Sequence, residues 1–297
     1  MGALTGRHLF ILGLGYSAAA VAERAMAAGA RVSGTTRDAD RAALLCASGI
    51  EAIRLDAGEK LPADRLDGVS DLLISIPPGP EGCTGLAMAR DALAHPQPGS
   101  GPGWIGYLSS TAVYGDCGGD WIDETRAPAP LGRDARGRLM AEAQWQAQAD
   151  RLGAGFDILR IAGIYGPGRN ILARLRAGDA RAILKPGQYF NRIHRDDIAG
   201  AVLAAMRDRK GTRITNLSDG APCPASEVMF GVAGMLGLPR PESIAFDDAG
   251  LPPGAAGFYA ENRRLRNERL LSLPGFALNH PDWKTGYAAI LAAERGA

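Results

Sequence analysis

The feature of the sequence that most constrains the fold is a glycine motif directly after a short apolar run. Gly13, Gly15 and Ala18 follow HLFILGL (8–14) in the pattern G-x-G-x-x-G/A, and an Ala-rich helical stretch, 17–28, continues from them. A strand, a tight turn and a helix in this order place the helix N-terminus against the pyrophosphate of a dinucleotide. Because a plain strand–turn–helix also favours glycine, the pattern alone is weak. The predicted contacts of the dinucleotide in this turn are Gly13, Leu14, Gly15, Tyr16 and Ser17.

Strand-like and helix-like segments alternate over the first two thirds of the chain. Near-continuous apolar strands separated by helices indicate a parallel sheet that is covered by helices on both faces. We therefore predict an α/β fold, a Rossmann-type doubly wound parallel sheet with a smaller C-terminal α/β substrate lobe. The predicted strands are 8–14, 30–36, 50–56, 71–77, 104–110 and 156–164, and the predicted helices between them are 17–28, 38–48, 84–94 and 138–152.

The rhythm of the sequence changes after Gly166. We expect a short helix, then a hairpin around Lys185-Pro186-Gly187, then a helix that starts after Asp197, while 214–219 indicates one more strand of the main sheet. The Gly- and Pro-rich stretch 95–103 is expected to be a flexible surface loop. Further helices are predicted at 226–236 and at the C-terminus. The predicted domains are a dinucleotide-binding Rossmann domain, 1–166 plus 194–219, and a smaller substrate-binding lobe, 167–193 plus 220–297.

Composition excludes several classes of partner. The formal net charge of +1 gives no global field that attracts nucleic acid or an anionic membrane. Glu23 and Arg24 end the first apolar region well short of the ~20 residues of a spanning helix. The four cysteines and four histidines are scattered, without C-x-x-C or H-E-x-x-H spacing, so we expect free thiols and no metal site. The expectation is a cytoplasmic monomer or homodimer that binds a small-molecule substrate, and neither nucleic acid nor membrane.

The end of the second predicted strand indicates which dinucleotide is bound. An acidic residue there would accept hydrogen bonds from the ribose 2′-OH of NAD and would repel a 2′-phosphate. This chain has Thr35, Thr36 and Arg37 instead, and hydroxyl and guanidinium groups suit a phosphate. The residues predict NADP as the cofactor, with NAD less favoured, and Thr36 and Arg37 as contacts of the phosphate. In the alternative, Arg37 is only solvated and Asp38 only caps the next helix.

Four further stretches occur in the order found in extended short-chain dehydrogenases/reductases, the group of nucleotide-sugar epimerases and dehydratases. They are YLSSTAVYG (107–115), LRIAGIYGPGR (159–169), RIHRDDIAGA (192–201) and TNLSDGAP (215–222). The chain resembles this NAD-dependent epimerase/dehydratase-like group over most of its length. The resemblance implies that Ser110, three residues before the Val of V-Y-G, bonds the reacting oxygen; a strand-end hydroxyl bonded to backbone is the alternative. It also implies cofactor contacts by Asp56, which would meet the adenine, and by Ser75, Ile76, Pro77 and Ser109.

The chain departs from the group at its catalytic Tyr-x-x-x-Lys pair. Alignment on Ala141-Glu142 places Asp134 at the tyrosine position and Arg138 at the lysine position. Arg138 can still bond the nicotinamide ribose and supply positive charge, but it is no base at neutral pH. Loss of a positioned proton donor typically costs ~10²–10⁴ in rate. The chain is thus identified as an atypical member of the extended short-chain dehydrogenase/reductase group, one that lacks the Tyr-x-x-x-Lys dyad.

Several residues are candidates for the missing proton donor. Tyr114 and Tyr165 follow strands whose carboxyl ends face the cleft, although each tyrosine can equally serve only packing. His194 has a suitable ordinary pKa, but we favour a structural role for it beside a helix that Asp197 caps. Candidate substrate contacts are Tyr165, Arg169 and Asn170, with Tyr259 and Arg263 in the basic segment 257–271, which is otherwise a solvated face.

Two functions follow from these residues. The first is an NAD(P)-binding oxidoreductase or epimerase-like enzyme, NADP preferred, that acts on an unidentified small polar or nucleotide-sugar-like substrate. The second is a catalytically inactive NADP(H)-binding sensor or regulatory protein, which the missing dyad favours and the retained Ser110 disfavours. A serine hydrolase is not expected, because no G-x-S-x-G surrounds Ser109.

Overall fold

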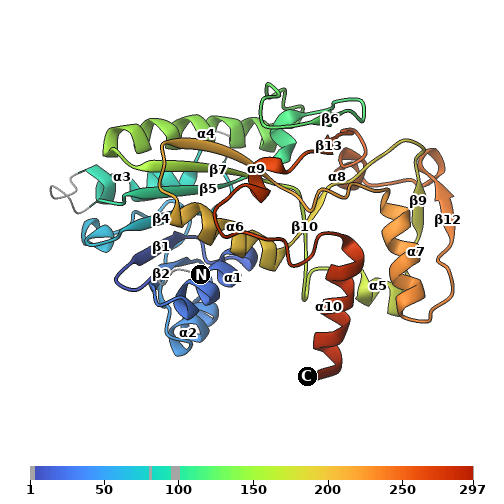
Figure 1. Ribbon diagram of the computed structural model, residues 1–297, viewed down its shortest axis with the longest axis horizontal. Coiled ribbons are helices and arrows are strands. Elements are labelled where there is room, and N and C mark those ends of the chain that lie inside the picture. The colour runs from blue at the N-terminus through green and yellow to red at the C-terminus, as the bar shows by residue number, and fades with distance from the viewer. Residues whose placement is uncertain (1–3, 80–81, 95–100, 297) are drawn as a thin grey trace.

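A computed structural model describes residues 4–79, 82–94 and 101–296; part of the predicted loop 95–103, residues 95–100, lies outside these ranges. A seven-stranded parallel sheet forms the centre, in the order β11-β7-β5-β4-β1-β2-β3 (Figure 1). This confirms the predicted α/β class and the parallel Rossmann-type sheet. The strands are β1 His8–Leu12, β2 Arg31–Thr36, β3 Glu51–Arg54, β4 Asp71–Ile74, β5 Trp104–Ser110, β7 Gly155–Ile161 and β11 Thr212–Leu217.

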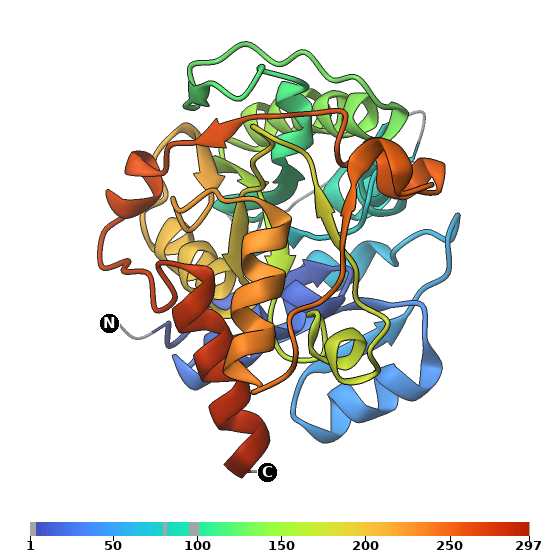
Figure 2. The same cartoon turned by 90° about the vertical axis from the view of Figure 1, so that its right-hand side faces the viewer.

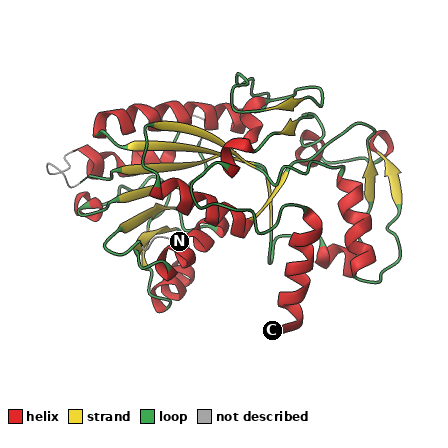
Figure 3. Ribbon diagram, viewed as in Figure 1, coloured by secondary structure: helices red, strands yellow, loops and turns green. Residues whose placement is uncertain are grey.

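Helices cover both faces of the sheet (Figure 3). Helices α1 (Tyr16–Ala27) and α6 (Arg195–Arg207) belong to the core on one face. Helices α3 (Thr84–Ala94) and α4 (Arg133–Leu152) belong to the core on the other face. Helix α2 (Ala39–Ala47) connects β2 to β3. Among the described helices, none combines the length and the apolar character that crossing a bilayer requires.

Strand β1 shows why the apolar run HLFIL becomes a central strand. Its residues are all buried, and successive side chains of a strand point to opposite faces of the sheet. Leu9 and Ile11 accordingly join the core beneath α1 and α6, whereas Phe10 and Leu12 join the core beneath α3 and α4. A run without polar interruption therefore fits only a strand that is covered on both sides.

The remaining elements gather beyond the carboxyl ends of the strands (Figure 2). Helices α5 (Leu172–Arg176), α7 (Ala225–Met235) and α10 (Trp283–Gly296) share a small core of their own. Strand β9 (Ala182–Leu184) pairs in parallel with β12 (Ser243–Ala245). The predicted hairpin around Lys185 is therefore wrong, because β9 finds its partner about sixty residues further along the chain. The division into domains stays a prediction.

Short elements complete the structure. They are η1 (Ala63–Leu66), η2 (Thr111–Tyr114), β6 (Trp121–Ile122), β8 (Gly163–Tyr165), β10 (Arg192–His194), η3 (Phe246–Asp248), α8 (Pro253–Gly257), β13 (Arg264–Leu265) and α9 (Glu268–Leu271).

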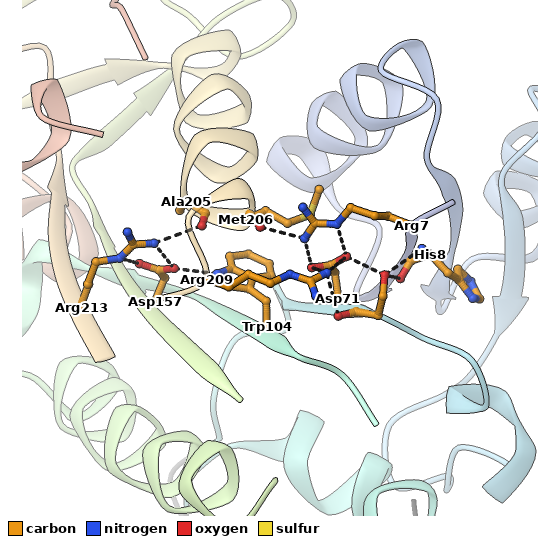
Figure 4. A network of polar contacts seen from close by, with 10 residues as sticks. Arg7, His8, Asp71, Trp104, Asp157, Ala205, Met206, Arg209 and Arg213 are labelled. Atoms are coloured by element: carbon orange, nitrogen blue, oxygen red, sulfur yellow. Dashed lines mark hydrogen bonds and ion pairs between the residues drawn. The ribbon is translucent and has the colours of Figure 1, made fainter. Parts of the chain in front are cut away.

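Buried ion pairs join the chain at the amino ends of the strands (Figure 4). Asp71, fully buried at the start of β4, accepts hydrogen bonds from Arg7, which precedes β1, and from Arg209, which follows α6. Asp157 of β7 accepts from Trp104 Nε1 at 2.6 Å and from Arg213 Nε at 2.8 Å. A buried carboxylate needs such partners. These contacts therefore hold together the amino ends of the strands, at the opposite end of the sheet from the glycine motif.

Candidate functional site

The order of the strands reverses between β1 and β4, and the glycine motif lies at this point. Strands β1 and β4 are neighbours, while the chain runs outward from β1 on one side and from β4 on the other. Ligands of open α/β sheets bind in the crevice at such a point, beyond the carboxyl ends of the strands. Gly13 has φ +94°, and a Cβ there would lie 2.8 Å from Ile76 Cγ1. The structure thus brings the predicted cofactor loop, Ser75 to Pro77, directly onto the glycine turn.

Gly15 leaves open space in front of helix α1. Its φ is −82°, and a Cβ at this position would meet no atom of the protein within 4 Å. Packing therefore does not require glycine here, whereas a ligand that approaches the backbone closely does. Gly15 is the N-cap of α1, and no side chain caps this helix. The exposed N-terminus of α1, with the N–H groups of Tyr16 and Ser17, fits a pyrophosphate.

Thr35, Thr36 and Arg37, the residues at the end of β2, have different surroundings. Of these, Thr36 and Arg37 were predicted to contact a phosphate. Thr35 is buried, and its hydroxyl accepts a hydrogen bond of 3.0 Å from the Gly13 N–H. Thr36 is largely buried, and Arg37 is exposed and makes no hydrogen bond or ion pair within the described ranges. Asp38 caps α2 by accepting from the Arg41 N–H, as predicted. Thr35 therefore holds the glycine turn, while Arg37 is available to a ligand.

Arg41 is a second guanidinium at this point that the sequence analysis missed. Its Nε donates a 2.9 Å hydrogen bond to the carbonyl of Leu14, inside the glycine turn. Arg37 precedes the N-cap of α2, so the four-residue spacing of a helix does not apply to this pair. Nothing local in the sequence indicated that Arg41 would reach back to Leu14.

Asp56 lies past the end of β3, two strands from β1. Its carboxylate forms an ion pair with Arg54, and its N–H donates to Glu59 Oε2 at 2.6 Å. The side chain is 43% exposed, so a ligand can reach it.

Two neighbouring serines at the end of β5 have different surroundings. Ser109 is buried, and its hydroxyl donates to Glu142 Oε1 at 2.5 Å. Ser110 is half-buried, and its hydroxyl accepts from the Ala112 N–H at 3.2 Å, at the start of η2. An accepting hydroxyl keeps its proton free for another partner. Ser110 is therefore the serine that can donate to a substrate oxygen.

Glu142 belongs to a buried charged pair that the sequence analysis did not identify as part of the site. Arg160 of β7 donates to both carboxylate oxygens of Glu142, at 3.1 and 2.7 Å. Both residues are buried, on α4 and on the neighbouring strand. The signal in the sequence was an arginine within the apolar strand FDILRI, since an isolated charge there requires a buried partner.

The two residues predicted to replace the dyad, Asp134 and Arg138, lie on the first turns of α4. Asp134 is exposed, and Arg138 donates from Nη1 to the Leu108 carbonyl at 3.2 Å. Arg138 also lies beside the buried phenol of Tyr107, whose pKa is raised by burial while the positive charge of Arg138 opposes that rise. The structure thus holds a guanidinium against β5, two residues before Ser110.

Tyr114 and Tyr165 both lie within the protein. Tyr114 is fully buried, and its hydroxyl donates to Asn216 Oδ1 at 2.8 Å. Tyr165 is 6% exposed, donates to the Asp282 carbonyl and stacks on Tyr287, with ring centroids 5.5 Å apart. Burial raises the pKa of both phenols. Both hydroxyls are thus engaged with partners of the protein itself.

His194 caps helix α6, so the predicted cap by Asp197 is wrong. The Asp196 N–H donates to His194 Nδ1 at 3.2 Å. The buried Asp197 carboxylate instead accepts from the N–H groups of Asn279 and His280, at 2.7 and 3.1 Å. Burial, with a smaller effect of the neighbouring His280, lowers the pKa of His194 to about 4. The ring is therefore neutral at pH 7.

One group of potential metal ligands occurs among the described residues, although the sequence predicted none. Ligand atoms of His194, Asp196 and His280 lie within 4.8 Å of one another. Nδ1 of His194, however, already accepts the Asp196 N–H, 3.8 Å from the Asp196 carboxylate. That lone pair is occupied, so the group does not fit a metal ion as it stands.

Two guanidinium groups lie near the ring of Tyr16, the first residue of α1. Its hydroxyl donates to the Pro167 carbonyl at 2.9 Å. The guanidinium groups of Arg169 and Arg195 lie 5.8 and 5.1 Å from the centre of its ring. Asn170, the other predicted substrate contact in this loop, uses both ends of its amide on the local backbone. Arg195 was not predicted from the sequence, because it is far from Tyr16 along the chain and only folding brings the two together.

Comparison with known proteins gives relatives that match nearly the whole chain. Protein YeeZ of Escherichia coli K12 is 32% identical over 293 residues, which cover 93% of this chain and 97% of YeeZ. The 3-diazoavenalumate denitrifying reductase of a Streptomyces species is 29% identical over 155 residues, 47% of this chain and 50% of the reductase. No protein-family model matches the chain.

Solved structures match equally well. A conserved protein of unknown function from Silicibacter pomeroyi has 39% identity and a TM-score of 0.88, with coverage of 97% of this chain and 99% of that one. A proposed NAD-dependent epimerase/dehydratase from Methylobacillus flagellatus has 26% identity and a TM-score of 0.70, covering 98% and 100%. MoeE5 with UDP-glucuronic acid and NAD, and human SDR39U1 with NADPH, share the fold at 19% and 17% identity. The structural neighbours are thus epimerase/dehydratase family proteins, some with a bound nicotinamide dinucleotide.

Proposed function

The chain belongs to the same family as Escherichia coli protein YeeZ, and from this premise we propose that it is an NADP-dependent oxidoreductase of the extended short-chain dehydrogenase/reductase type. Its active site is atypical, because Asp134 and Arg138 occupy the positions of the usual dyad. The substrate is a small polar or nucleotide-sugar-like molecule.

The open space at Gly15, together with Arg37, which makes no ion pair within the described ranges, is the observation that carries this proposal. A pyrophosphate fills the space before the uncapped N-terminus of α1, where the N–H groups of Tyr16 and Ser17 point. Arg37 at the end of β2 would hold the extra phosphate of NADP, and Arg41, which bonds the Leu14 carbonyl, would supply a second guanidinium. Asp56 contacts the adenine, and Ser75 to Pro77 pass beneath the dinucleotide.

The bound nicotinamide supplies or accepts a hydride. The chain supplies the remaining functions. Ser110 would donate a hydrogen bond to the substrate oxygen, and Arg138 would place positive charge beside it and bond the ribose. A donor other than these two residues supplies the proton that accompanies hydride transfer. Ser109, fixed by Glu142, holds the end of β5 in position. Tyr114 and Tyr165 are left out of the proposed catalytic set, since their hydroxyls bond to Asn216 and Asp282 inside the protein.

Two relatives support a reductive or sugar-directed reaction. The Streptomyces relative is named a reductase of a diazo compound, and MoeE5 binds a UDP-sugar together with NAD. Both chemistries need a dinucleotide at the switch point of the sheet, which the glycine turn supports.

A sensor without turnover is the second candidate. The exposed Asp134 and the backbone-bound Arg138 favour it, because neither is a proton donor at neutral pH. The two functions separate when purified protein is mixed with NADPH and a panel of carbonyl compounds and nucleotide sugars, while absorbance of the reduced ring is followed. Turnover that Ser110→Ala abolishes supports the enzyme; saturable NADPH binding without turnover supports the sensor. Absence of any calorimetric binding of NADPH and NADH contradicts both.

A further inference from the structure

A cleft of about 350 Å³ lies between helices α7 and α8 and the β9–β12 pair. Ile183 and Ile244 are opposite each other in register and form part of its wall. Apolar side chains dominate the lining, and each is only half-buried, so the protein itself does not fill the space. The apolar lining comprises Ile183, Ala225, Met229, Ile244, Ala249, Leu251 and Ala255.

The remaining lining residues give the cleft a positive rim. Arg174 has no carboxylate partner within the described ranges, and its Nη2 approaches only the Asp179 carbonyl, at 3.5 Å. Arg181 pairs with Glu242 at 3.9 Å, and both side chains are largely exposed, which makes this pair weak. Asp179 supplies the only negative charge of the lining. Burial raises the pKa of Tyr259, so its hydroxyl stays protonated and can donate.

A short segment connects this cleft to the proposed reaction centre. Tyr259 is four residues before Arg263, a span of at most ~14 Å in an extended chain. Arg263 Nη1 donates to the Gly115 carbonyl at 2.7 Å, and Gly115 ends the loop that follows Ser110. The Asn262 N–H also bonds Asp116, at 2.8 Å. The segment therefore joins the wall of the cleft at Tyr259 to the chain that follows Ser110.

We propose that this cleft binds a small molecule that combines an apolar group with a carboxylate. The apolar walls take the hydrocarbon part, while Arg174 and Arg181 take the anion. This binding is independent of the proposed function, since it uses none of the residues of the dinucleotide site.

The test is calorimetry with trans-cinnamate, an apolar carboxylate, with cinnamyl alcohol as its uncharged analogue, and with succinate and UMP. We expect cinnamate to bind, and the alcohol and succinate to bind about tenfold more weakly or worse, because each lacks one half of the recognition. Arg174→Ala should weaken cinnamate by about tenfold. Ala225→Phe, which fills the cleft from the first residue of α7, should abolish binding.

Arg176→Ala is the matched control. Arg176 lies on the same helix, lines the neighbouring hollow and pairs with Glu294, so its loss should leave cinnamate affinity unchanged. Equal affinity for cinnamate and its alcohol, tighter binding of UMP, or normal binding by folded Ala225→Phe overturns the proposal. Thermal unfolding establishes that each variant is folded. NADPH titration of the same proteins separates the two claims, because its failure contradicts the proposed function and leaves the cinnamate result standing.

Discussion

Ser109 donates a 2.5 Å hydrogen bond to Glu142 Oε1 in the interior of the protein, whereas the next residue, Ser110, keeps its hydroxyl proton free. Two adjacent serines thus have separate roles. One fixes the end of β5 to helix α4, and the other is half-buried with a hydroxyl proton that is free for a ligand.

The two serines should respond differently to substitution. Ser110→Ala should lower kcat by about 10²-fold or more, because it removes a donor to the reacting oxygen, and should cost stability only the ~0.5–2 kcal/mol of the cap on η2. Ser109→Ala should instead lower the free energy of unfolding by ~1–3 kcal/mol, because Glu142 loses a buried partner. Steady-state kinetics and urea unfolding on both variants are the measurements. Equal kinetic losses with equal stability would contradict the separation of roles.

Arg37 and Arg41 should decide the choice of cofactor. Each alanine variant should weaken NADPH by ~10–100-fold and NADH by little, because only NADPH carries the phosphate that forms charge-assisted hydrogen bonds with them. Arg31→Ala at the other end of β2 is the control, since Arg31 pairs with Glu51 at the surface. Calorimetric titrations that show the same loss for both dinucleotides would mean that neither guanidinium reads the phosphate.

Alanine substitutions at Gly13 and Gly15 should have different effects, the first on the stability of the protein and the second on its affinity for NADPH. Gly15→Ala should leave thermal stability unchanged, since its φ suits any residue and its Cβ enters open space, yet weaken NADPH by about tenfold. Gly13→Ala should destabilise the protein itself, because of its φ of +94° and the contact with Ile76. The idea fails if Gly15→Ala binds NADPH normally.

Two buried groups should give stability opposite dependences on pH. The pKa of His194 falls from 6.5 to about 4 on folding, so the unfolded chain binds more protons in this window and stability is lost as the pH falls. The pKa of Asp219 rises to about 7 through burial, so the folded chain binds more protons and stability is lost as the pH rises from about 4 to 7. His194→Asn should therefore reduce the acid loss of stability, and Asp219→Asn the loss towards neutral pH. Urea unfolding at several pH values tests both; unchanged slopes in both variants would rule this out.

Loss of the buried Asp71 carboxylate should lower the free energy of unfolding more than loss of an exposed carboxylate. Asp71→Asn leaves Arg7 and Arg209 facing a neutral group, and since both arginines are partly solvated we expect the lower end of the usual range, about 3 kcal/mol. Glu51→Gln breaks an exposed pair with Arg31 and should cost less than about 1 kcal/mol. Chemical denaturation compares the two, and similar small losses would show that the buried cluster contributes little.

The sequence predicted those features that depend on neighbouring residues. The continuous apolar run of β1, the glycine turn and the cap by Asp38 are local, so their patterns are visible along the chain. The hairpin at Lys185 and the cap by Asp197 were wrong for the opposite reason. β9 pairs with a distant strand, and Asp197 binds the distant backbone of Asn279.

The same distinction holds in the candidate site. Arg195 meets Tyr16, and Glu142 meets Arg160, only after the sheet has assembled. The spacing of these residues along the chain does not indicate that they will be in contact. Arg41 likewise meets the Leu14 carbonyl only in the folded chain.

The two ion pairs of Asp71 form with residues that leave the ribosome at different times during translation. Arg7 leaves the ribosome before this carboxylate, but Arg209 follows it by well over a hundred residues. A nascent chain therefore carries a half-neutralised acid at the rim of its growing sheet until α6 has emerged, and β11 arrives later still. Completion of the sheet is thus a late event of translation, and shortened chains that end before residue 209 should be targets for chaperones and proteases.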